Sequence, residues 1–452
     1  MERDEFERVA ASFAVFHAEF APLFGRKDRQ RRSEQYVRGL LVQQTDRRNA
    51  ENVAECIEGA TPRVLQRLLT ESPWATEPVI ARLQGYLGPR LNTVEGVFIL
   101  DESGFPKQGQ RSVGVSHQYC GVLGKVANCQ MGVFLAYASA RGHALVDLRL
   151  FLPERWTKDQ ARCQEAGVPA AVAFQSKAAL GLAMLRQARS LGQLQGCRVT
   201  ADDAYGEVPS LRDALDAEGW EYVLEVPSTT YVFTTLPAVV VPAHLGRGRR
   251  YTVPRLAPGA APAQAIPAVA ALASTAWQEL TVAEGAQGPR TYQFAALRVW
   301  ESRQGLPGRA CWLLLRHNLD GSEPRFYLAN LPPETCLLTL ARIAAVRWVI
   351  ETDFQTAKGE AGLDEYEVRS WQSWHHHLTL ALLAATFLLT LQQDWGGKYA
   401  PDHAYSAQSP ATGTAASAPL HRSGSAAVAH YHPTAQRARQ TLAPQTALGQ
   451  TA

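Results

Sequence analysis

A short apolar run that ends in two carboxylates places the tightest constraint on the fold of this chain. The segment VEGVFIL, residues 94–100, has the length of a buried strand, and Asp101 and Glu102 follow it at once. A strand end holds side chains more firmly than a loop does. CRVTADDAYGE, residues 197–207, repeats the arrangement with a short strand that ends in Asp202 and Asp203. The sequence therefore predicts an α/β fold with acidic side chains at two strand ends.

The rest of the chain divides into regions of different character. Residues 1–92 carry apolar side chains at three- and four-residue spacing and are expected to be helical, whereas residues 93–227 alternate strand-like and helix-like segments. Residues 228–330 hold short β-like runs between Gly-, Pro- and Ala-rich loops, which predicts an all-β insertion. Residues 331–395 are expected to be helical, with one helix from about 334 to 361. Residues 396–452 have little apolar bulk, which predicts a disordered tail.

Composition indicates an intracellular protein without a membrane span. The seven cysteines show no zinc-site spacing, the N-terminus has no apolar core of a secretory signal, and the net charge is +3. The longest apolar stretch, residues 378–391, is short for a membrane helix and is expected to be a buried one. Residues 26–48 are locally basic, and they form either a solvated helix face or a surface for DNA phosphates.

A third acidic element lies in RWVIETDFQTAK, residues 347–358. At about 100° per residue, Arg347, Glu351 and Lys358 share one helix face. One alternative is an ordinary surface pair, although the order Arg before Glu is the weaker one for helix stability. The other is a site in which Asp101, Asp202 and Glu351 converge, and three such carboxylates would need cations.

Carboxylate-only ligands favour Mg²⁺, with Mn²⁺ possible, over zinc. Two such ions about 4 Å apart can activate the attacking oxygen and stabilise the leaving oxygen of a phosphodiester. Arg347 and Lys358 would then hold the DNA backbone beside the ions.

Other polar residues near these motifs are weaker candidates for the site. We expect Asp202 rather than Asp203 to face the site, because side chains alternate along a strand. Glu102 is expected to be a solvated neighbour or a supporting group. Lys107 and Lys125 either contact phosphate or are ordinary loop lysines.

Two further groups of side chains are less promising as sites. Residues 375–377 are three histidines that point about 100° apart on a helix, which favours a surface or DNA contact over a metal site. Trp371 and Trp374 are expected to pack in the core.

Taken together, these blocks resemble a DDE-type insertion-sequence transposase of the branch numbered four, subgroup seven-hundred-and-one. The blocks are DESGFPKQGQRSVGVSHQYCGVLGKVANCQMGVFLAYAS, VTADDAYGE and RWVIETDFQTAKGEAGLDEYEVRSWQSWHHHLTLALLA. Arg347, Glu351 and Lys358 fit the signature of the third block, but Ala344 stands at its tyrosine position and His117 at an expected arginine. The resemblance implies an RNase H-like catalytic core, with Asp101, Asp202 and Glu351 as metal ligands, interrupted by the β-rich segment.

The resemblance also implies an activity and its partners. We expect a Mg²⁺-dependent transposase that cuts and rejoins double-stranded DNA at terminal inverted repeats and at a target. It would act as a homodimer assembled on DNA, in the bacterial cytoplasm and on the nucleoid when bound. One alternative is a relative that binds DNA but has lost the chemistry. Another is a hydrolase such as a glycosidase that uses two of the carboxylates.

Overall fold

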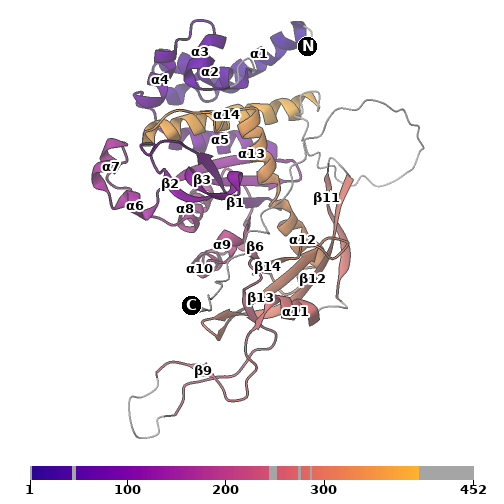
Figure 1. Ribbon diagram of the computed structural model, residues 1–452. Coiled ribbons are helices and arrows are strands. Elements are labelled where there is room, and N and C mark those ends of the chain that lie inside the picture. The colour runs from indigo at the N-terminus through magenta and orange to yellow at the C-terminus, as the bar shows by residue number, and fades with distance from the viewer. Residues whose placement is uncertain (1–2, 43–46, 244–251, 273–275, 286–287, 397–452) are drawn as a thin grey trace, which may run out of the picture.

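The computed structural model describes residues 3–42, 47–243, 252–272, 276–285 and 288–396. Within these residues, helices from both ends of the chain lie together over one end of a large mixed sheet (Figure 1). A second group of strands extends the sheet away from those helices. The predicted disordered tail, residues 396–452, lies outside the described residues except for Gly396.

The N-terminal region is helical, as its periodicity predicts. Asn49 begins one of these helices by accepting hydrogen bonds from the amides of Glu51 and Asn52, and Pro62 starts the next in its first turn, where no amide is needed. The region contains α1 (Arg3–Ala18), a 3₁₀ turn η1 (Ala21–Phe24), α2 (Lys27–Leu41), α3 (Ala50–Cys56), α4 (Pro62–Thr70) and α5 (Thr76–Leu91).

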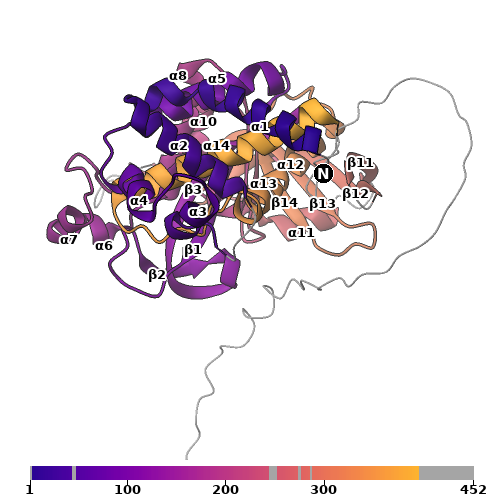
Figure 2. The same cartoon turned by 90° about the horizontal axis from the view of Figure 1, so that it is seen from above.

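The apolar helix near the C-terminus, α14 (Trp371–Trp395), is the centre around which these helices pack. It contacts α2, α4 and α5 and also β4 of the sheet, against which α5 packs as well (Figures 1 and 2). Ser370 and Ser373 cap its start reciprocally. By length and composition this helix could cross a membrane, but 78% of its most apolar window is buried inside the protein. It is therefore a core helix, as the sequence predicts.

Five strands form the half of the sheet beneath these helices, in the order β4–β3–β1–β5–β6. β3 runs antiparallel to β1 and β4, whereas β5 and β6 run parallel to β1. β2 and the turn η2 adjoin the start of β3, and five helices of different lengths, α6 to α10, belong to this half. The strands are β1 (Val97–Pro106), β2 (Ser116–Cys120), β3 (Lys125–Ser139), β4 (Gly142–Phe151), β5 (Arg198–Ala201) and β6 (Glu221–Val226), and the other elements are η2 (Gly121–Leu123), α6 (Glu154–Thr157), α7 (Gln160–Glu165), α8 (Lys177–Leu191), α9 (Asp203–Gly206) and α10 (Pro209–Ala217).

Residues 228–330 extend the same sheet, because β14 pairs antiparallel with β6. From there the strand order continues β13–β12–β7–β10. β11 pairs with the first part of β12, and β8 and β9 form a separate two-stranded sheet. The prediction of an all-β segment is wrong in one respect: its described part includes the helix α11 (Ile266–Leu272), whose apolar side chains cover the sheet. The strands are β7 (Tyr231–Phe233), β8 (Val239–Val240), β9 (Arg255–Leu256), β10 (Gln264–Ala265), β11 (Gln278–Gly285), β12 (Gly288–Arg303), β13 (Leu306–His317) and β14 (Arg325–Ala329).

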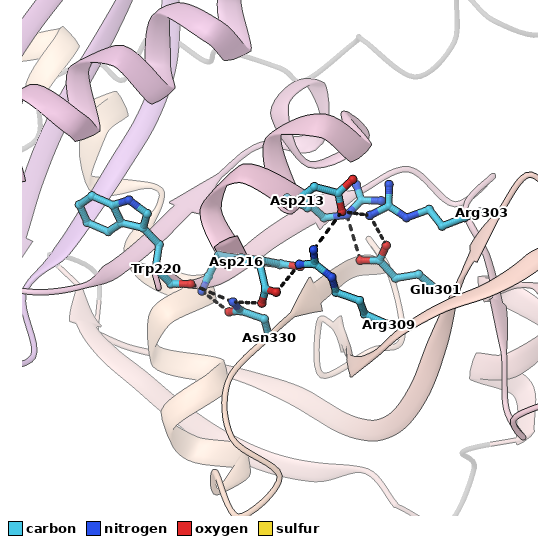
Figure 3. Close-up of polar contacts among 9 residues, drawn as sticks. Asp213, Asp216, Trp220, Glu301, Arg303, Arg309 and Asn330 are labelled. Carbon is cyan, nitrogen blue, oxygen red and sulfur yellow. Dashed lines mark hydrogen bonds and ion pairs between the residues drawn. The ribbon is translucent and has the colours of Figure 1, made fainter. Parts of the chain in front are cut away.

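Polar contacts hold α10 against this extension (Figure 3). Arg303 donates to Asp213 at 3.0 Å, and Arg309 pairs with Asp216. The Asn330 amide donates to Asp216 at 3.0 Å. The two parts of the sheet are thus joined by side chains as well as by the strand pair.

The single helix expected over residues 334–361 is wrong, because two helices occupy that stretch. α12 (Leu337–Val346) and α13 (Val349–Gly359) are separated by Arg347 and Trp348. The amides of Ile350 and Glu351 bond three residues back, to the carbonyls of Arg347 and Trp348. This tighter turn interrupts the α-helical pattern beside the acidic strand ends.

Candidate active site

Two aspartates come together because neighbouring parallel strands end at the same level. Leu100 of β1 pairs with Ala201 of β5, and each is followed directly by an acidic residue. Asp101 continues in β1 opposite Phe134, while Asp202 leaves the sheet at the end of β5. The two strand ends that carry carboxylates in the sequence therefore lie together at one edge of the sheet.

Asp202 is fixed by the short helix that it begins. Its side chain accepts a hydrogen bond from the amide of Tyr205 at 3.4 Å, and Asp203 points to solvent. Gly206 then passes so close to β6 that a Cβ atom there would lie 1.8 Å from the carbonyl oxygen of Glu225. The DDAYG sequence thus caps a helical turn and lets it pack tightly beside a second acidic strand.

Arg347 bridges the strand edge and α13. Its guanidinium lies 3.4 Å from Asp101 Oδ2, 2.9 Å from Glu351 Oε1 and 3.9 Å from Glu225 Oε2. Glu351 is in the first turn of α13 with 56% of its side chain exposed, while the Asp101 side chain is only 13% exposed. One arginine therefore links two of the three predicted carboxylates, Asp101 and Glu351, while Asp202 lies beside Asp101 at the neighbouring strand end.

The electrostatics of this edge favour added positive charge. Burial raises the pKa of Asp101 to about 6, against the attraction of Arg347. Burial and the negative charge of Asp101 raise the pKa of Asp202 to about 7. Arg347 has a pKa above its ordinary value because Asp101, Glu351 and Glu225 outweigh its burial. The two aspartates are thus poorly solvated and repel each other.

This donor set suits a hard divalent cation, since carboxylate oxygens are the ligands that Mg²⁺ and Mn²⁺ prefer. Across the described ranges, however, no three His, Cys, Asp or Glu side chains are grouped so that they could hold a metal ion. Arg347 now contacts both Asp101 and Glu351. To join the aspartates around a cation, the half-exposed Glu351 side chain would have to leave this arginine and rotate.

The lysines considered as DNA contacts lie in three different settings. Lys107 donates to the carbonyl of Tyr366 at 3.2 Å and lies 3.7 Å from the centre of its ring, and burial lowers its pKa to about 8. Burial also lowers the pKa of Lys358, which lies 5.7 Å from the Phe105 ring centre. Lys125 is exposed at the start of β3. Only Lys125 is open to solvent.

The expectation that the three consecutive histidines form a surface or DNA contact is wrong. They lie within α14, and the N-terminal region covers the face of this helix that carries His376 and His377. The two ring nitrogens of His376 lie 2.9 Å from the carbonyls of Leu69 and Trp74, and its neutral ring donates to one of them. His377 bonds the hydroxyl of Tyr36 and the carbonyl of Gly362. Burial lowers the pKa of both His376 and His377 to about 4, so they are neutral core groups.

Trp374 packs in the core as expected, and Glu102 has a supporting contact. Trp374 is fully buried and donates to the Tyr366 hydroxyl at 3.0 Å. Glu102 is not simply solvated, because Lys177 pairs with it at 2.6 Å.

Two residues of the site were missed from the sequence. Glu225, in an otherwise apolar strand, faces Arg347, and Tyr205 is 1% exposed with a hydroxyl that has no hydrogen-bond partner among the described residues. Glu225 carried a usable signal, since it is a charge within the predicted buried strand WEYVLEVP.

Comparison with protein families gives a match over residues 19–289 to the model described as DDE superfamily endonuclease. The matched range contains Asp101 and Asp202 and stops before Glu351. A search of curated proteins found no match.

Proposed function

The chain belongs to the DDE superfamily endonucleases, and on that premise we propose that it is a transposase of the branch-four, subgroup seven-hundred-and-one type. It would cut and rejoin phosphodiester bonds at the ends of an insertion sequence. The observation that carries this proposal is the meeting of Asp101 and Asp202 at adjacent strand ends, with Glu351 linked to Asp101 through Arg347.

The arrangement of the sheet supports an RNase H-like catalytic core. The order β4–β3–β1–β5–β6, with β3 antiparallel and β5 and β6 parallel to β1, places the first two acidic residues side by side. Residues 228–330 would be the insertion within this core, and residues 1–92 a DNA-binding region. The apolar core of that N-terminal region is continuous with the core around β1, so the two would act as one body.

The family generally uses divalent metals, and we propose Mg²⁺ held by Asp101, Asp202 and Glu351, with Mn²⁺ as a substitute. When bound, a pair of such ions would supply activation of the attacking oxygen and stabilisation of the leaving oxygen. The other contributions come from the chain itself.

Arg347 has a role that changes with the charge of the site. In this structure it neutralises Asp101 and Glu351. If Asp101 and Glu351 held a cation instead, its guanidinium would be available to hold a phosphate in two-point contact. Lys358, Lys107 and Lys125 would add positive charge along the path of the DNA.

The substrate would be double-stranded DNA, first at the terminal inverted repeats and then at the target site. Two ends must be joined, so a homodimer on the DNA is the expected active form. The protein would work in the cytoplasm, on the nucleoid when bound.

A second candidate is a DNA-binding relative that no longer cuts. Two observations favour it: Ala344 stands at the tyrosine position of the third motif, and Glu351 is not grouped with both aspartates. The two candidates differ in a single measurable property, metal-dependent cleavage.

The test uses a plasmid that carries the genomic flanks of the gene. We expect the wild type to nick it with Mg²⁺ and not in EDTA. Asp101→Asn, Asp202→Asn and Glu351→Gln should bind the plasmid normally and cut at least about 100-fold more slowly. Asp203→Asn, whose side chain points to solvent beside the site, is the matched control and should cut normally. Binding without cleavage by the wild type would favour the second candidate, and cleavage in EDTA would exclude both.

A further inference from the structure

Three arginines lie on the strands that lead away from the acidic edge, two of them opposite each other and the third four residues further along β12. They are Arg325 of β14, Arg316 of β13 and Arg290 of β12, and we call them the arginine row. The register places Glu225 opposite Tyr327, and Arg325 opposite Arg316. Side chains directly opposite each other lie on the same face of a sheet. The row therefore starts beside Glu225, which is itself 3.9 Å from Arg347.

The pairing of Arg325 with Arg316 is unfavourable for the fold alone. Like charges directly opposite on neighbouring strands destabilise a sheet. Arg325 is compensated by Glu225 at 2.7 Å, but within the described part of the chain Arg316 has no carboxylate partner. Its Nε atom is buried and makes no hydrogen bond to any described residue. A stable sheet does not need this arrangement, and it leaves the charge of Arg316 without a carboxylate among the described residues.

Aromatic rings hold the two outer arginines in place. The Arg316 guanidinium lies 4.2 Å from the centre of the Tyr292 ring, and that of Arg290 lies 3.4 Å from the centre of the Trp348 ring. A stacked guanidinium keeps its edge N–H groups free for an oxyanion. Trp348 follows Arg347 directly, so the row and the acidic edge meet at the junction of α12 and α13.

The charges of Arg316, Arg325 and Arg347 all act on Tyr327. Burial and Glu225 raise the pKa of Tyr327 to about 12, although Arg316, Arg347 and Arg325 all act on its hydroxyl in the opposite sense. The charges of three guanidiniums thus reach a tyrosine that lies opposite Glu225 in the register. This density of positive charge adjoins the place where the scissile bond would lie.

We propose that the arginine row binds the phosphodiester backbone of the DNA strand whose scissile bond lies at the acidic edge. The proposal rests on the proposed function and adds a surface to it. Arg316 and Arg290 would contact successive phosphates from their aromatic supports. Arg325 would join them when phosphate competes with Glu225. Such contacts carry no sequence information, and they would set the path of the strand out of the site.

The test measures binding of a labelled duplex of about 40 base pairs, in Ca²⁺, as a function of salt concentration. Each phosphate contact that is lost should lower the salt slope by about one. We expect that change, with several-fold weaker binding, for Arg316→Gln and for Arg290→Gln, and a change of about two for the double variant. Arg316→Lys keeps the charge and should keep the slope.

Arg298→Gln is the matched control. Arg298 lies on β12 near Trp312, 5.1 Å from the ring centre, and it too has a buried guanidinium nitrogen without a hydrogen bond to a described residue. It differs in place, because the register puts it two residues beyond the level of Glu225, on the side away from Arg316 and Arg290. It should bind DNA as the wild type does. Melting temperatures of all variants would show that they fold.

The outcomes separate this inference from the proposed function. If Arg316→Gln and Arg290→Gln match Arg298→Gln in affinity and slope while the wild type still cuts DNA, the arginine row is not a DNA surface and the proposed function stands. If the wild type binds no DNA at all, both proposals are overturned.

Discussion

Replacing Asp202 with asparagine should make the metal-free protein more stable at neutral pH. Burial and the charge of Asp101 raise the pKa of Asp202 from 3.8 to about 7. An aspartate whose pKa is raised on folding supports the fold below about pH 4, and that support is lost as the pH rises towards 7. Asparagine carries no charge and caps a helix as well as aspartate does, so the hydrogen bond to the amide of Tyr205 is kept.

The size of the effect follows from this pKa. A change from 3.8 to about 7 corresponds to about 4 kcal/mol, since one pKa unit is worth about 1.4 kcal/mol. Relaxation of the site and entry of water reduce that value. We therefore expect Asp202→Asn to raise the free energy of unfolding by about 1–2 kcal/mol at pH 8. The melting temperature should rise by about 2–4 °C per kcal/mol.

The assay is a melting temperature in EDTA, measured for wild type and variant from pH 4 to pH 8. The advantage of Asp202→Asn should grow from near zero at pH 4 to its full size above pH 7. Asp203→Asn, at the exposed neighbouring position, should show no such trend. A variant that is less stable than the wild type at pH 8, or equally stable at every pH, would refute the electrostatic reasoning.

Two further substitutions test the packing and the charge balance around the site. Gly206→Ala should lower the free energy of unfolding by about 2–3 kcal/mol in urea titrations, because its methyl would meet the Glu225 carbonyl at 1.8 Å. Gly121→Ala, which meets nothing within 4 Å, should cost far less, and equal losses would contradict this account. Lys177→Met should destabilise the protein by about 2 kcal/mol, because it leaves the partly buried Glu102 unpaired. Adding Glu102→Gln should recover most of that loss in thermal unfolding, and a double variant as unstable as the single one would argue that the pair does not matter.

Strand ends and apolar runs were readable from the sequence because each depends on local pattern. VEGVFIL and CRVTA became β1 and β5, and the apolar stretch 378–391 became the centre of α14. The ends of β1 and β5 lie at one edge of the sheet because the two strands are parallel and Leu100 pairs with Ala201. The mixed α/β fold and the membership of the endonuclease family are therefore confirmed.

Tertiary contacts decided the features that local pattern could not predict. On a helix His376 and His377 point about 100° apart, and the carbonyls of Leu69 and Gly362 that bond them come close only in the folded chain. The break at Arg347 likewise has no glycine or proline to announce it. Arg347 bonds Asp101 from 246 residues away, so its bridging position could not be read from the spacing of residues in one helix.

The central claim, that Asp101, Asp202 and Glu351 together hold divalent cations, can be tested by replacing Mg²⁺ with Fe²⁺. Hydroxyl radicals generated by ascorbate and peroxide at bound iron cut the polypeptide nearby, and mass spectrometry locates the cuts. We expect fragments that end near residues 101, 202 and 351, and we expect excess Mg²⁺ to suppress all three cuts together. Cuts confined to other parts of the chain, or cuts that Mg²⁺ does not suppress, would contradict the claim.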